Sequence, residues 1–537
     1  MTVARPDTTR RGPGDYTGPL DTANMTESNP ETDETVIDVP VEQPTMDPGH
    51  LSFTPETGWN ALYLDGEWHP AGGRESYPMT DPATRSEMGS TPIGTAADVE
   101  TAYEAAAAAQ PAWASRTPTD RARLLEAVRE TLNSWAGELQ PLFARECGGV
   151  PAKAGFEIEL ATEMLRRSEG LALQVSGEHK QSVVEQKHTE VHREPVGVVG
   201  VISPWNFPLY LSLRAVAPAV ATGNTVVLKP AEDTPLLGGL VLARAFEEAG
   251  VPDGVLSVIP GDGDRTGDAV ASHPTPRVLS FTGSSEVGRS VGQKAVAEFT
   301  YPSLELGGNN PHIVTAAADL DWAVDAGVFG SFTHQGQECI SINRHVVHES
   351  HAETYANRVA DRARSLPVGD PKAEQTVVGP VQTEAQRDKI VSLIEKSVAA
   401  GATVLAGGST DGLFVEPTVL TDVTSEMPIA REEHFGPVAP VIEYTTETEA
   451  IKIANETRYG LSGSVHSTDL AQARRIAEAM ETGMVHINDQ PLNDHANTPF
   501  GGVGASGLGR YNDEAAIRQF TETKWLSVQR EPREYPY

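Results

Sequence analysis

The chain has 537 residues, 39% of them hydrophobic, so it is long enough for two or three domains with sizeable cores. Its formal net charge of −34 at pH 7 argues against nucleic acid as a partner, because a phosphate backbone requires clustered Lys and Arg. The sequence shows no apolar run of membrane-spanning length and no secretory signal, so we predict a cytoplasmic protein without a membrane partner. It has only two cysteines and no Cys/His cluster with metal-ligand spacing, so we predict neither a metal site nor a disulfide framework.

The N-terminal segment, residues 1–55, is rich in Pro, Thr, Asp and Glu and has almost no apolar periodicity. Such a segment cannot bury enough apolar surface to offset its ordering entropy, which predicts a disordered tail. The first strand is expected at residues 61–64, with Gly66 at the following turn.

Helical patterns dominate residues 95–175. Residues 95–116 are rich in Ala, and Thr117, Pro118 and Asp120 supply an N-cap, a first-turn proline and an acidic third position. We expect two or three helices in this stretch.

From residue 196 short apolar strands alternate with helices. Strands are expected at residues 196–202, 225–228, 255–259 and 278–281, and the rhythm restarts after Glu305 with a strand at 311–314 and a helix from 321. This alternation predicts an α/β fold with parallel sheets covered by helices. We place a first α/β domain at residues 56–177 and 196–304, and a second at 305–509.

Two further segments, residues 178–194 and 516–529, alternate polar with apolar residues and are predicted to be strands. From the residues alone they could be two surface hairpin strands.

Cys339 lies on a Gly-containing turn among polar neighbours, in Thr-His-Gln-Gly-Gln-Glu-Cys-Ile-Ser-Ile-Asn-Arg over residues 333–344. A structural cysteine usually sits in an apolar run, whereas a nucleophilic thiol needs partial access to solvent. The other cysteine, Cys147, lies at an expected helix end and is interpreted as structural.

Several other motifs accompany Cys339 in a fixed order. They are Pro-Trp-Asn-Phe-Pro at 204–208, Leu-Lys-Pro at 228–230, Phe-Thr-Gly-Ser at 281–284, Leu-Glu-Leu-Gly-Gly at 304–308 and Glu-Glu-His-Phe-Gly-Pro at 432–437. Together they resemble the aldehyde dehydrogenase superfamily from about residue 60 to about 528. The resemblance implies a Rossmann-like cofactor domain, a second α/β catalytic domain, and a small β oligomerisation domain made by residues 178–195 and 510–537, through which a homodimer or homotetramer forms.

A Gly-rich turn at residues 261–267 resembles a dinucleotide fingerprint but has one residue too many before its last glycine, so a plain surface turn is the alternative. The helix that opens at Gly283-Ser284 offers free N–H groups for a pyrophosphate. By resemblance, Lys229 and Glu232 contact the adenosine ribose, although alone they could be a surface pair. A carboxylate at Glu232 would repel a 2′-phosphate, which favours NAD over NADP.

The family resemblance extends the cofactor contacts to residues along the same motifs, where Glu433 and Phe435 face the nicotinamide side. The predicted cofactor-binding residues are Ile202, Ser203, Pro204, Trp205, Lys229, Glu232, Gly263, Gly267, Phe281, Gly283, Ser284, Gly288, Leu306, Glu433 and Phe435.

Oxidation of an aldehyde by hydride transfer needs a tetrahedral carbon, which a thiolate can create. The resemblance implies that Cys339 is this nucleophile, and that the Asn206 amide with the Cys339 backbone N–H stabilises the oxyanion. Glu305 is then the general base that activates the water releasing the acid. Read without the family, Asn206 could be an Asx-turn residue and Glu305 a charge near a helix start.

Two more carboxylates bear on this site. Glu338 precedes Cys339 where many relatives have a neutral residue; a carboxylate facing the sulfur would raise the thiol pKa, so we expect Glu338 to face the tunnel wall or solvent and to disfavour acidic substrates. Glu514 falls where some relatives carry a second proton-relay carboxylate.

The motifs around residues 334–344 and 499–512 look most like the branch acting on benzaldehyde or vanillin-type aldehydes. Aliphatic aldehydes, succinate semialdehyde and betaine aldehyde stay open as alternatives. So do two other functions: transfer of the acyl group to coenzyme A, which Glu305 argues against because that branch commonly lacks a base there, and a non-catalytic structural oligomer.

The basic residues are ten lysines and 31 arginines. An acidic, lysine-poor surface resembles that of proteins from salt-loving organisms, where high ionic strength screens self-repulsion. We therefore predict a halophilic protein; an ordinary acidic cytosolic enzyme, active without molar salt, is the alternative.

Overall fold

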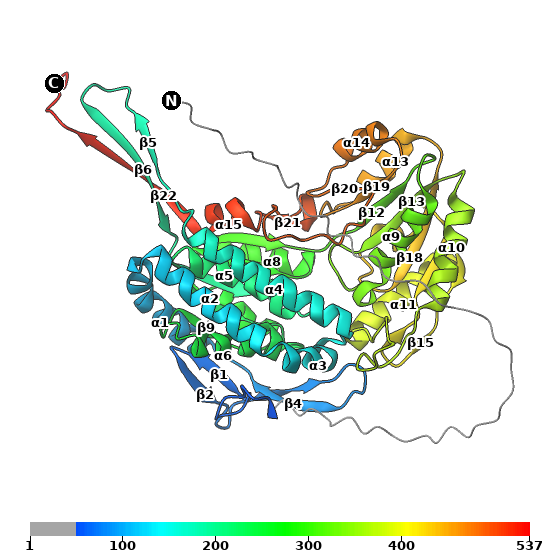
Figure 1. The fold of residues 1–537 in the computed structure, drawn as a ribbon, viewed down its shortest axis with the longest axis horizontal. Helices are drawn as coiled ribbons and strands as arrows, with labels where there is room; N and C mark the ends of the chain where they lie inside the picture. Colours follow the sequence, from blue (N-terminus) through cyan, green and yellow to red (C-terminus); the bar gives the residue numbers. More distant parts are fainter. Residues whose placement is uncertain (1–49) are drawn as a thin grey trace, which may run out of the picture. The chain divides into compact units, whose positions relative to one another are not determined.

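The structure is a computed structural model that describes residues 50–537 (Figure 1). Nearly all of the predicted tail therefore lies outside the described residues. Its predicted end at residue 55 is wrong, because Leu51 and Phe53 are buried and the Phe53 ring stacks on Trp135 with centroids 4.1 Å apart. Two apolar side chains are enough to anchor this segment, although they give no periodic pattern.

The predicted α/β fold is confirmed: two large sheets are each covered by helices. The first sheet has eight strands in the order β2-β1-β9-β8-β7-β10-β11-β21. Strands β9, β8, β7, β10 and β11 run parallel, whereas β1 and β21 pair antiparallel to their neighbours. Its strands are β1 (Ala61–Leu64), β2 (Glu67–Pro70), β7 (Val198–Ile202), β8 (Thr225–Lys229), β9 (Leu256–Val258), β10 (Val278–Thr282), β11 (Tyr301–Glu305) and β21 (Gly507–Leu508).

Both faces of this sheet are buried, because alternate side chains of each parallel strand enter two different cores. Val226 and Leu228 join the core on the side of α5 and α6, and Val227 joins the core on the side of α1 and α8. The surrounding helices are α1 (Ala96–Ser115), α2 (Pro118–Ser134), α3 (Ala136–Cys147), α4 (Pro151–Ala172), α5 (Pro208–Ala221), α6 (Val241–Glu248), α7 (Asp268–Ala271) and α8 (Ser285–Ala297).

Residues 95–175 form four helices, so the expectation of two or three is wrong. The predicted caps are present: Thr117 accepts a hydrogen bond from the Asp120 backbone N–H, with Pro118 in the first turn of α2. The break between α2 and α3 falls at Trp135 alone. A single residue without Gly or Pro carries no helix-stop signal, which is why the sequence does not reveal it.

The second sheet has seven strands in the order β14-β17-β18-β13-β12-β19-β20, and only β14 pairs antiparallel. Its strands are β12 (Asn310–Val314), β13 (Ile342–His348), β14 (Thr403–Ala406), β17 (Thr418–Val423), β18 (Val438–Tyr444), β19 (Ser464–His466) and β20 (His486–Ile487). Its helices are α9 (Leu320–Phe332), α10 (Ala352–Ser365), α11 (Glu384–Ala399), α12 (Pro428–Arg431), α13 (Glu447–Asn455) and α14 (Leu470–Ala479). Two further small pairs are β3 (Ser76–Thr80) with β4 (Glu87–Pro92), and β15 (Thr410–Asp411) with β16 (Phe414–Val415).

A separate three-stranded sheet, in the order β22-β6-β5, projects away from the two large sheets (Figure 1). It contains β5 (Glu178–Gln181), β6 (Lys187–Pro195) and β22 (Thr521–Gln529). The predicted strand at residues 516–529 is wrong for its first part, because α15 (Asp513–Phe520) is a helix whose Ala516, Ile517 and Phe520 face the core at helical spacing. Trp525 and Val528 on β22 are exposed; the role of this sheet in subunit pairing stays a prediction.

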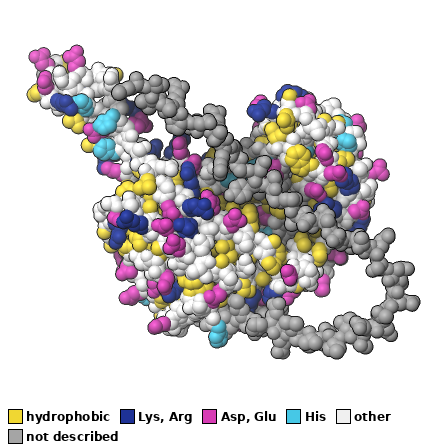
Figure 2. Space-filling model, viewed as in Figure 1, with side chains coloured by type: hydrophobic (Ala, Val, Ile, Leu, Met, Phe, Trp, Pro, Cys, Tyr) yellow, Lys and Arg dark blue, Asp and Glu magenta, His cyan; other side chains and the backbone are white. Residues whose placement is uncertain are grey.

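Acidic side chains are spread over the visible face of the molecule rather than gathered in one patch (Figure 2). Among the described residues, no helix is long and apolar enough to cross a membrane. Within the same part of the chain, no group of three or more His, Cys, Asp and Glu side chains could hold a metal ion.

Candidate active site

The carboxyl ends of the parallel strands of the first sheet form one continuous edge. In the strand register Lys229 of β8 pairs with Ile202 of β7, Ile202 with Phe281 of β10, and Thr282 with Glu305 of β11. The chain runs from β7 outward to β8 and β9, then returns to the other side of β7 for β10 and β11. The strand order thus reverses between β7 and β10, the point at which ligands bind in open α/β sheets.

The second sheet meets this edge with the starts of its strands. Glu305 ends β11, and only five residues later Asn310 begins β12 and pairs with Ile342 at the start of β13. Cys339 lies just before β13 and is partly exposed. The crossing between the two sheets therefore brings Cys339 to the carboxyl edge that carries Glu305.

The turn before Cys339 is held in an unusual backbone conformation. His334 (φ 45°) and Gln335 (φ 58°) both lie in the left-handed region, which is costly for residues with side chains. The Gln335 side chain donates hydrogen bonds to the Gly148 and Pro380 carbonyls at 3.1 and 2.9 Å, which hold the turn in place. Such strain fixed by surrounding bonds is typical of functional sites.

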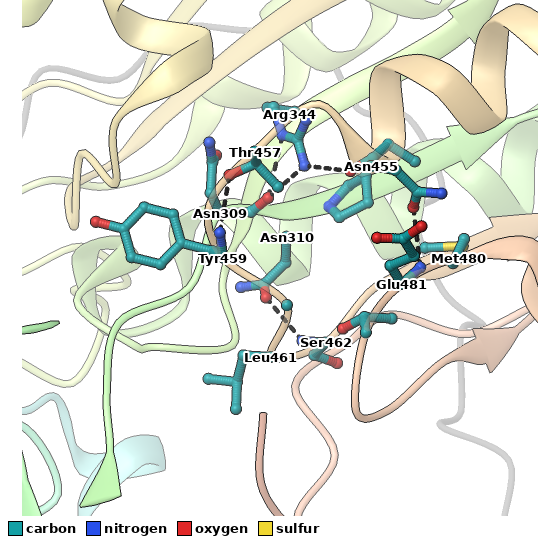
Figure 3. Close-up of a pocket in the computed structure, with 14 residues that line it drawn as sticks. Asn309, Asn310, Arg344, Asn455, Thr457, Tyr459, Leu461, Ser462, Met480 and Glu481 are labelled. Carbon is teal, nitrogen blue, oxygen red and sulfur yellow. Dashed lines mark hydrogen bonds between the residues drawn. The ribbon is translucent and has the colours of Figure 1, made fainter. Parts of the chain in front are cut away.

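A second set of bonds supports Cys339 from the side of the second sheet. Asn310 Nδ2 donates to the backbone carbonyls of Cys339 and Ser341 at 2.8 and 2.7 Å, and its Oδ1 accepts from the Ser462 N–H at 3.0 Å. Figure 3 shows Asn310 beside a small polar pocket that Asn309 and Arg344 also line. The buried Arg344 guanidinium donates to the Asn309 carbonyl at 2.7 Å, so the backbone between Glu305 and β12 is fixed as well.

Asn206, in the loop after β7, is also brought to Cys339. Both residues line one pocket, and Asn206 Nδ2 donates to the Gln337 carbonyl at 3.0 Å. An amide nitrogen carries two hydrogens, so a second donor remains on Asn206. Asn206 and Cys339 therefore line one pocket, and Glu305 is near enough for its charge to raise the pKa of the Cys339 thiol, while the role of each residue stays a prediction.

The pocket in front of Cys339 has mostly apolar and aromatic walls. Its empty volume is about 430 Å³, part of which is open to solvent. The pocket is lined by Phe156, Leu160, Asn206, Phe207, Tyr210, Leu211, Arg214, Glu338, Cys339, Ile340, Leu492, Asp494 and Phe500. Seven of these residues also line a larger outer cleft, which gives this inner pocket an entrance.

Glu305 is buried, and neither of its carboxylate oxygens has a hydrogen-bond partner among the described residues. Burial raises the pKa of Glu305 to about 8, and the positive charges of Arg214 and Arg510 oppose this rise. A carboxyl group with its pKa near the working pH can accept and release a proton, as a general base must.

Arg214 was not predicted as a site residue. Its buried guanidinium donates from Nη1 to Asp494 Oδ2 at 3.1 Å and lies over the Phe500 ring at 4.3 Å. Asp494 is fixed in turn by Asn512, whose Nδ2 donates to Oδ1 at 2.8 Å. The only signal in the sequence was one arginine inside the apolar helix Pro208–Ala221, because a buried cation requires partners.

The surroundings of Cys339 disfavour its thiolate in the free protein. Burial raises the pKa of the Cys339 thiol above its ordinary value; Arg214 lowers it, and the carboxyl groups of Glu433, Glu305 and Glu338 raise it further. A proton acceptor is therefore needed to generate the nucleophile, and Glu305 is the uncommitted candidate.

The predicted cofactor residues lie along the same carboxyl edge. Lys229 is buried with Nζ 3.9 Å from Glu232 Oε2, and the same oxygen accepts from the Gly263 N–H at 3.1 Å. Ser284 is the N-cap of α8, and the buried Ser203 hydroxyl after β7 has no partner among the described residues. These groups suit the hydroxyls and phosphates of a dinucleotide, so the residues present fit NAD.

The remaining predicted cofactor residues flank this row and extend it toward Cys339. Leu306 lies against Gly288, where an added Cβ would be 2.2 Å from the Leu306 side chain, and Gly283 lies against the Phe281 ring in the same way. Glu433 accepts from the Gly308 N–H at 2.8 Å, and the Phe435 ring meets Trp205 edge-on. Pro204 lies in the loop after β7, and Gly267 ends the π-helical turn Gly263–Gly267 between β9 and α7.

Glu514 does not lie at this site. Its side chain is 74% exposed at the start of α15 and accepts from Arg518 at 3.0 Å. The suggestion of a second proton-relay carboxylate at Glu514 is therefore wrong, because the helix that replaces the expected strand turns it to solvent. Cys147, in contrast, is buried at the end of α3 as expected.

Gly507 holds the strand of Glu305 and offers a test. It pairs with Glu305 at φ 142°, and an added Cβ would lie 2.0 Å from the Leu304 carbonyl oxygen. We expect Gly507→Ala to separate β21 from β11, to lower the free energy of unfolding by about 2 kcal/mol, and to reduce kcat by displacing Glu305. Thermal unfolding and steady-state kinetics measure both effects.

The matched control is Gly137→Ala in α3, where an added Cβ meets nothing within 4 Å. Gly137→Ala should leave kcat unchanged, and it should leave the free energy of unfolding unchanged or raise it slightly. Equal behaviour of the two variants would contradict the assigned role of Gly507.

Comparison with known proteins adds to this geometry. Residues 68–526 match the sequence profile of the aldehyde dehydrogenase family. The chain is 42% identical over 480 residues to a benzaldehyde dehydrogenase [NAD(+)] of Pseudomonas putida, covering 89% of this chain and 98% of the relative. It is 43% identical over 489 residues to a vanillin dehydrogenase of an Amycolatopsis species, covering 91% of this chain and 100% of the relative.

Among solved structures, a salicylaldehyde dehydrogenase from Pseudomonas putida G7, complexed with salicylaldehyde, superposes with a TM-score of 0.87 at 35% identity. The alignment covers 89% of this chain and 99% of that chain. The sequence and fold comparisons thus each cover most of the chain.

Proposed function

This chain belongs to the aldehyde dehydrogenase family, and we propose that it oxidises an aromatic aldehyde to its carboxylic acid with NAD, through a thioester on Cys339. One observation carries the proposal: a partly exposed thiol and the Asn206 amide line one aromatic-walled pocket, and the buried, unpaired Glu305 carboxyl group is close enough to raise the pKa of that thiol. Named relatives that act on benzaldehyde, vanillin and salicylaldehyde support the aromatic substrate.

The first step is attack by the Cys339 sulfur on the aldehyde carbon. Glu305 takes the thiol proton, a C–S bond forms, and the carbonyl oxygen gains negative charge. The second hydrogen of Asn206 Nδ2 and the Cys339 backbone N–H are the donors for this oxygen. Because Asn310 and the Gln335 contacts fix the backbone of the turn, these donors need little rearrangement.

Lys229, Glu232 and Ser284 would hold NAD, which would supply the acceptor for the hydride of the tetrahedral carbon. Glu232 keeps its carboxylate toward this edge, which disfavours the extra phosphate of NADP. A thioester then remains on Cys339, and its hydrolysis needs an activated water.

Glu305 is the group for this hydrolysis. Once Glu305 has released the thiol proton to solvent, its carboxylate, which has no other hydrogen-bond partner among the described residues, can accept a proton from water as the water attacks the thioester carbon. The acid leaves as the C–S bond breaks and the sulfur regains a proton. Transfer to coenzyme A would not require this base, and the burial of Glu305 beside Cys339 therefore favours hydrolysis.

The function is tested by following NADH formation with benzaldehyde, hexanal, succinate semialdehyde and betaine aldehyde, at low and at molar KCl. We expect benzaldehyde to give the highest kcat/KM, NAD to exceed NADP, and no dependence on coenzyme A. Turnover only when coenzyme A is present would favour the acylating alternative. Lack of turnover with every aldehyde, in either salt, would contradict the proposal and favour a structural role.

A further inference from the structure

Glu338 occupies a position at which a charged residue needs an explanation. It is 6% exposed and lines both the inner pocket and the outer cleft, so it stands where the two spaces join. The structure thus places it in the pocket wall, one of the two positions expected from the sequence. No step of the proposed chemistry uses it.

The carboxyl group of Glu338 is incompletely satisfied. Its buried Oε1 has no hydrogen-bond partner among the described residues. An unsatisfied buried oxygen costs about 1–3 kcal/mol, so such a group in a ligand pocket indicates a partner supplied by the ligand.

The surfaces around Glu338 suit an aromatic ring. Phe156, Phe207 and Tyr210 line both the inner pocket and the outer cleft, and Phe500 closes the inner pocket. Aromatic walls favour a flat apolar ligand through offset or edge-on ring contacts. A ring held there by its aldehyde carbon at Cys339 lies in the space that Glu338 also lines.

The electrostatics around Glu338 select the kind of group it can bind. Burial raises the pKa of Glu338 to about 8; Lys153 lowers it and Glu157 raises it. Lys153 is already committed, with Nζ donating to Glu157 Oε2 at 2.5 Å and lying over the Phe207 ring at 4.6 Å. The Glu338 carboxyl group is therefore best matched by an uncharged group of the ligand that can both donate and accept a hydrogen bond.

We propose that Glu338 is a specificity-determining residue whose carboxyl group hydrogen-bonds a hydroxyl on the ring of an aromatic aldehyde. The inference rests on the proposed function and names its substrate class as hydroxybenzaldehydes. A ring carboxylate beside Glu338 would meet a second carboxyl group, so acidic aldehydes are disfavoured.

The test compares kcat/KM for benzaldehyde with that for 2-, 3- and 4-hydroxybenzaldehyde in wild type, Glu338→Gln and Glu338→Leu. Glu130→Leu, an exposed carboxylate on α2, is the matched control. We expect one hydroxy isomer to be preferred by wild type and Glu130→Leu. In Glu338→Leu its advantage over benzaldehyde should fall by about tenfold, and Glu338→Gln, which can still donate and accept, should keep most of it.

A second readout is independent of turnover: calorimetric binding of the preferred isomer and of benzaldehyde to Cys339→Ala, with and without Glu338→Leu. The leucine should weaken binding of the hydroxy isomer alone. Equal losses for both ligands, or an unchanged preference, would overturn the role of Glu338 while leaving aldehyde oxidation in place. Failure of wild type to oxidise any aldehyde would instead remove the proposed function, and this inference with it.

Discussion

Replacing Cys339 by alanine is expected to abolish aldehyde-dependent NADH formation, with a loss in kcat of about four orders of magnitude or more. The reason is chemical: without the sulfur there is no C–S bond, and the planar aldehyde carbon is a poor hydride donor. Steady-state kinetics with benzaldehyde and NAD measure the loss.

The control for this variant separates chemistry from folding. The thiol is partly exposed and its loss leaves the contacts of Asn310 and Gln335 to the backbone intact, so thermal unfolding and NAD binding should stay close to wild type. In wild type, iodoacetamide should modify Cys339 and spare the buried Cys147, as judged by mass spectrometry of peptides. Rates that match wild type in Cys339→Ala would remove this residue from the mechanism.

Glu305→Gln is expected to slow both halves of the reaction, because Glu305 is assigned to thiol deprotonation and to hydrolysis. The variant should form its thioester slowly, give at most about one NADH per site and then stall, with the steady-state rate lowered by roughly 10²–10⁴. Rapid-mixing absorbance measures the burst, and intact-protein mass spectrometry detects the acyl group on Cys339. Hydroxylamine, a nucleophile that needs no base, should release the acyl group.

The pH dependence of the hydrolysis rate gives a second test of Glu305. Since burial raises the pKa of Glu305 to about 8, its basic form is scarce at pH 6 and predominates above pH 8. The wild-type rate of hydrolysis should therefore rise with pH through this region and level off above it, and Glu305→Gln should lack this rise.

Glu514→Gln is the matched carboxylate control, because this side chain is exposed and pairs with Arg518. It should retain the wild-type rate and pH profile. Continued turnover by Glu305→Gln at the wild-type rate would contradict the assignment of the base. A wild-type pH profile in Glu305→Gln would mean that a group other than Glu305 causes the rise in rate with pH.

The sequence predicted the part of the site that lies on local motifs. Asn206, Glu305 and Cys339 were expected together because the motifs that carry them resemble the aldehyde dehydrogenase superfamily, whereas the residues alone left Asn206 open as an Asx-turn residue and Glu305 as a charge near a helix start. Arg214 and Asp494 could not be found in this way. Their pairing joins residues far apart in the chain, and the lone arginine in an apolar helix does not reveal its partner.

The errors in the predicted fold have similar physical causes. Leu51 and Phe53 are buried in the core, but two apolar residues are too few to leave a periodic pattern in the sequence. Residues 516–520 form a helix because Ile517 and Phe520 reach a tertiary core, whereas the short apolar alternation was equally compatible with a strand. In a segment shorter than two helical turns, the local pattern of apolar residues does not distinguish a helix from a strand.

The antiparallel pairing of β11 with β21 joins Glu305 to Gly507, roughly 200 residues later in the chain, and this has a consequence for folding during synthesis. A ribosome that has made the whole second sheet has still not made the strand that covers β11. Until then β11 has an open hydrogen-bonding edge, a feature that promotes association with other chains. A truncation that ends before residue 507 should therefore yield an aggregating product, even though every residue of the catalytic trio is present.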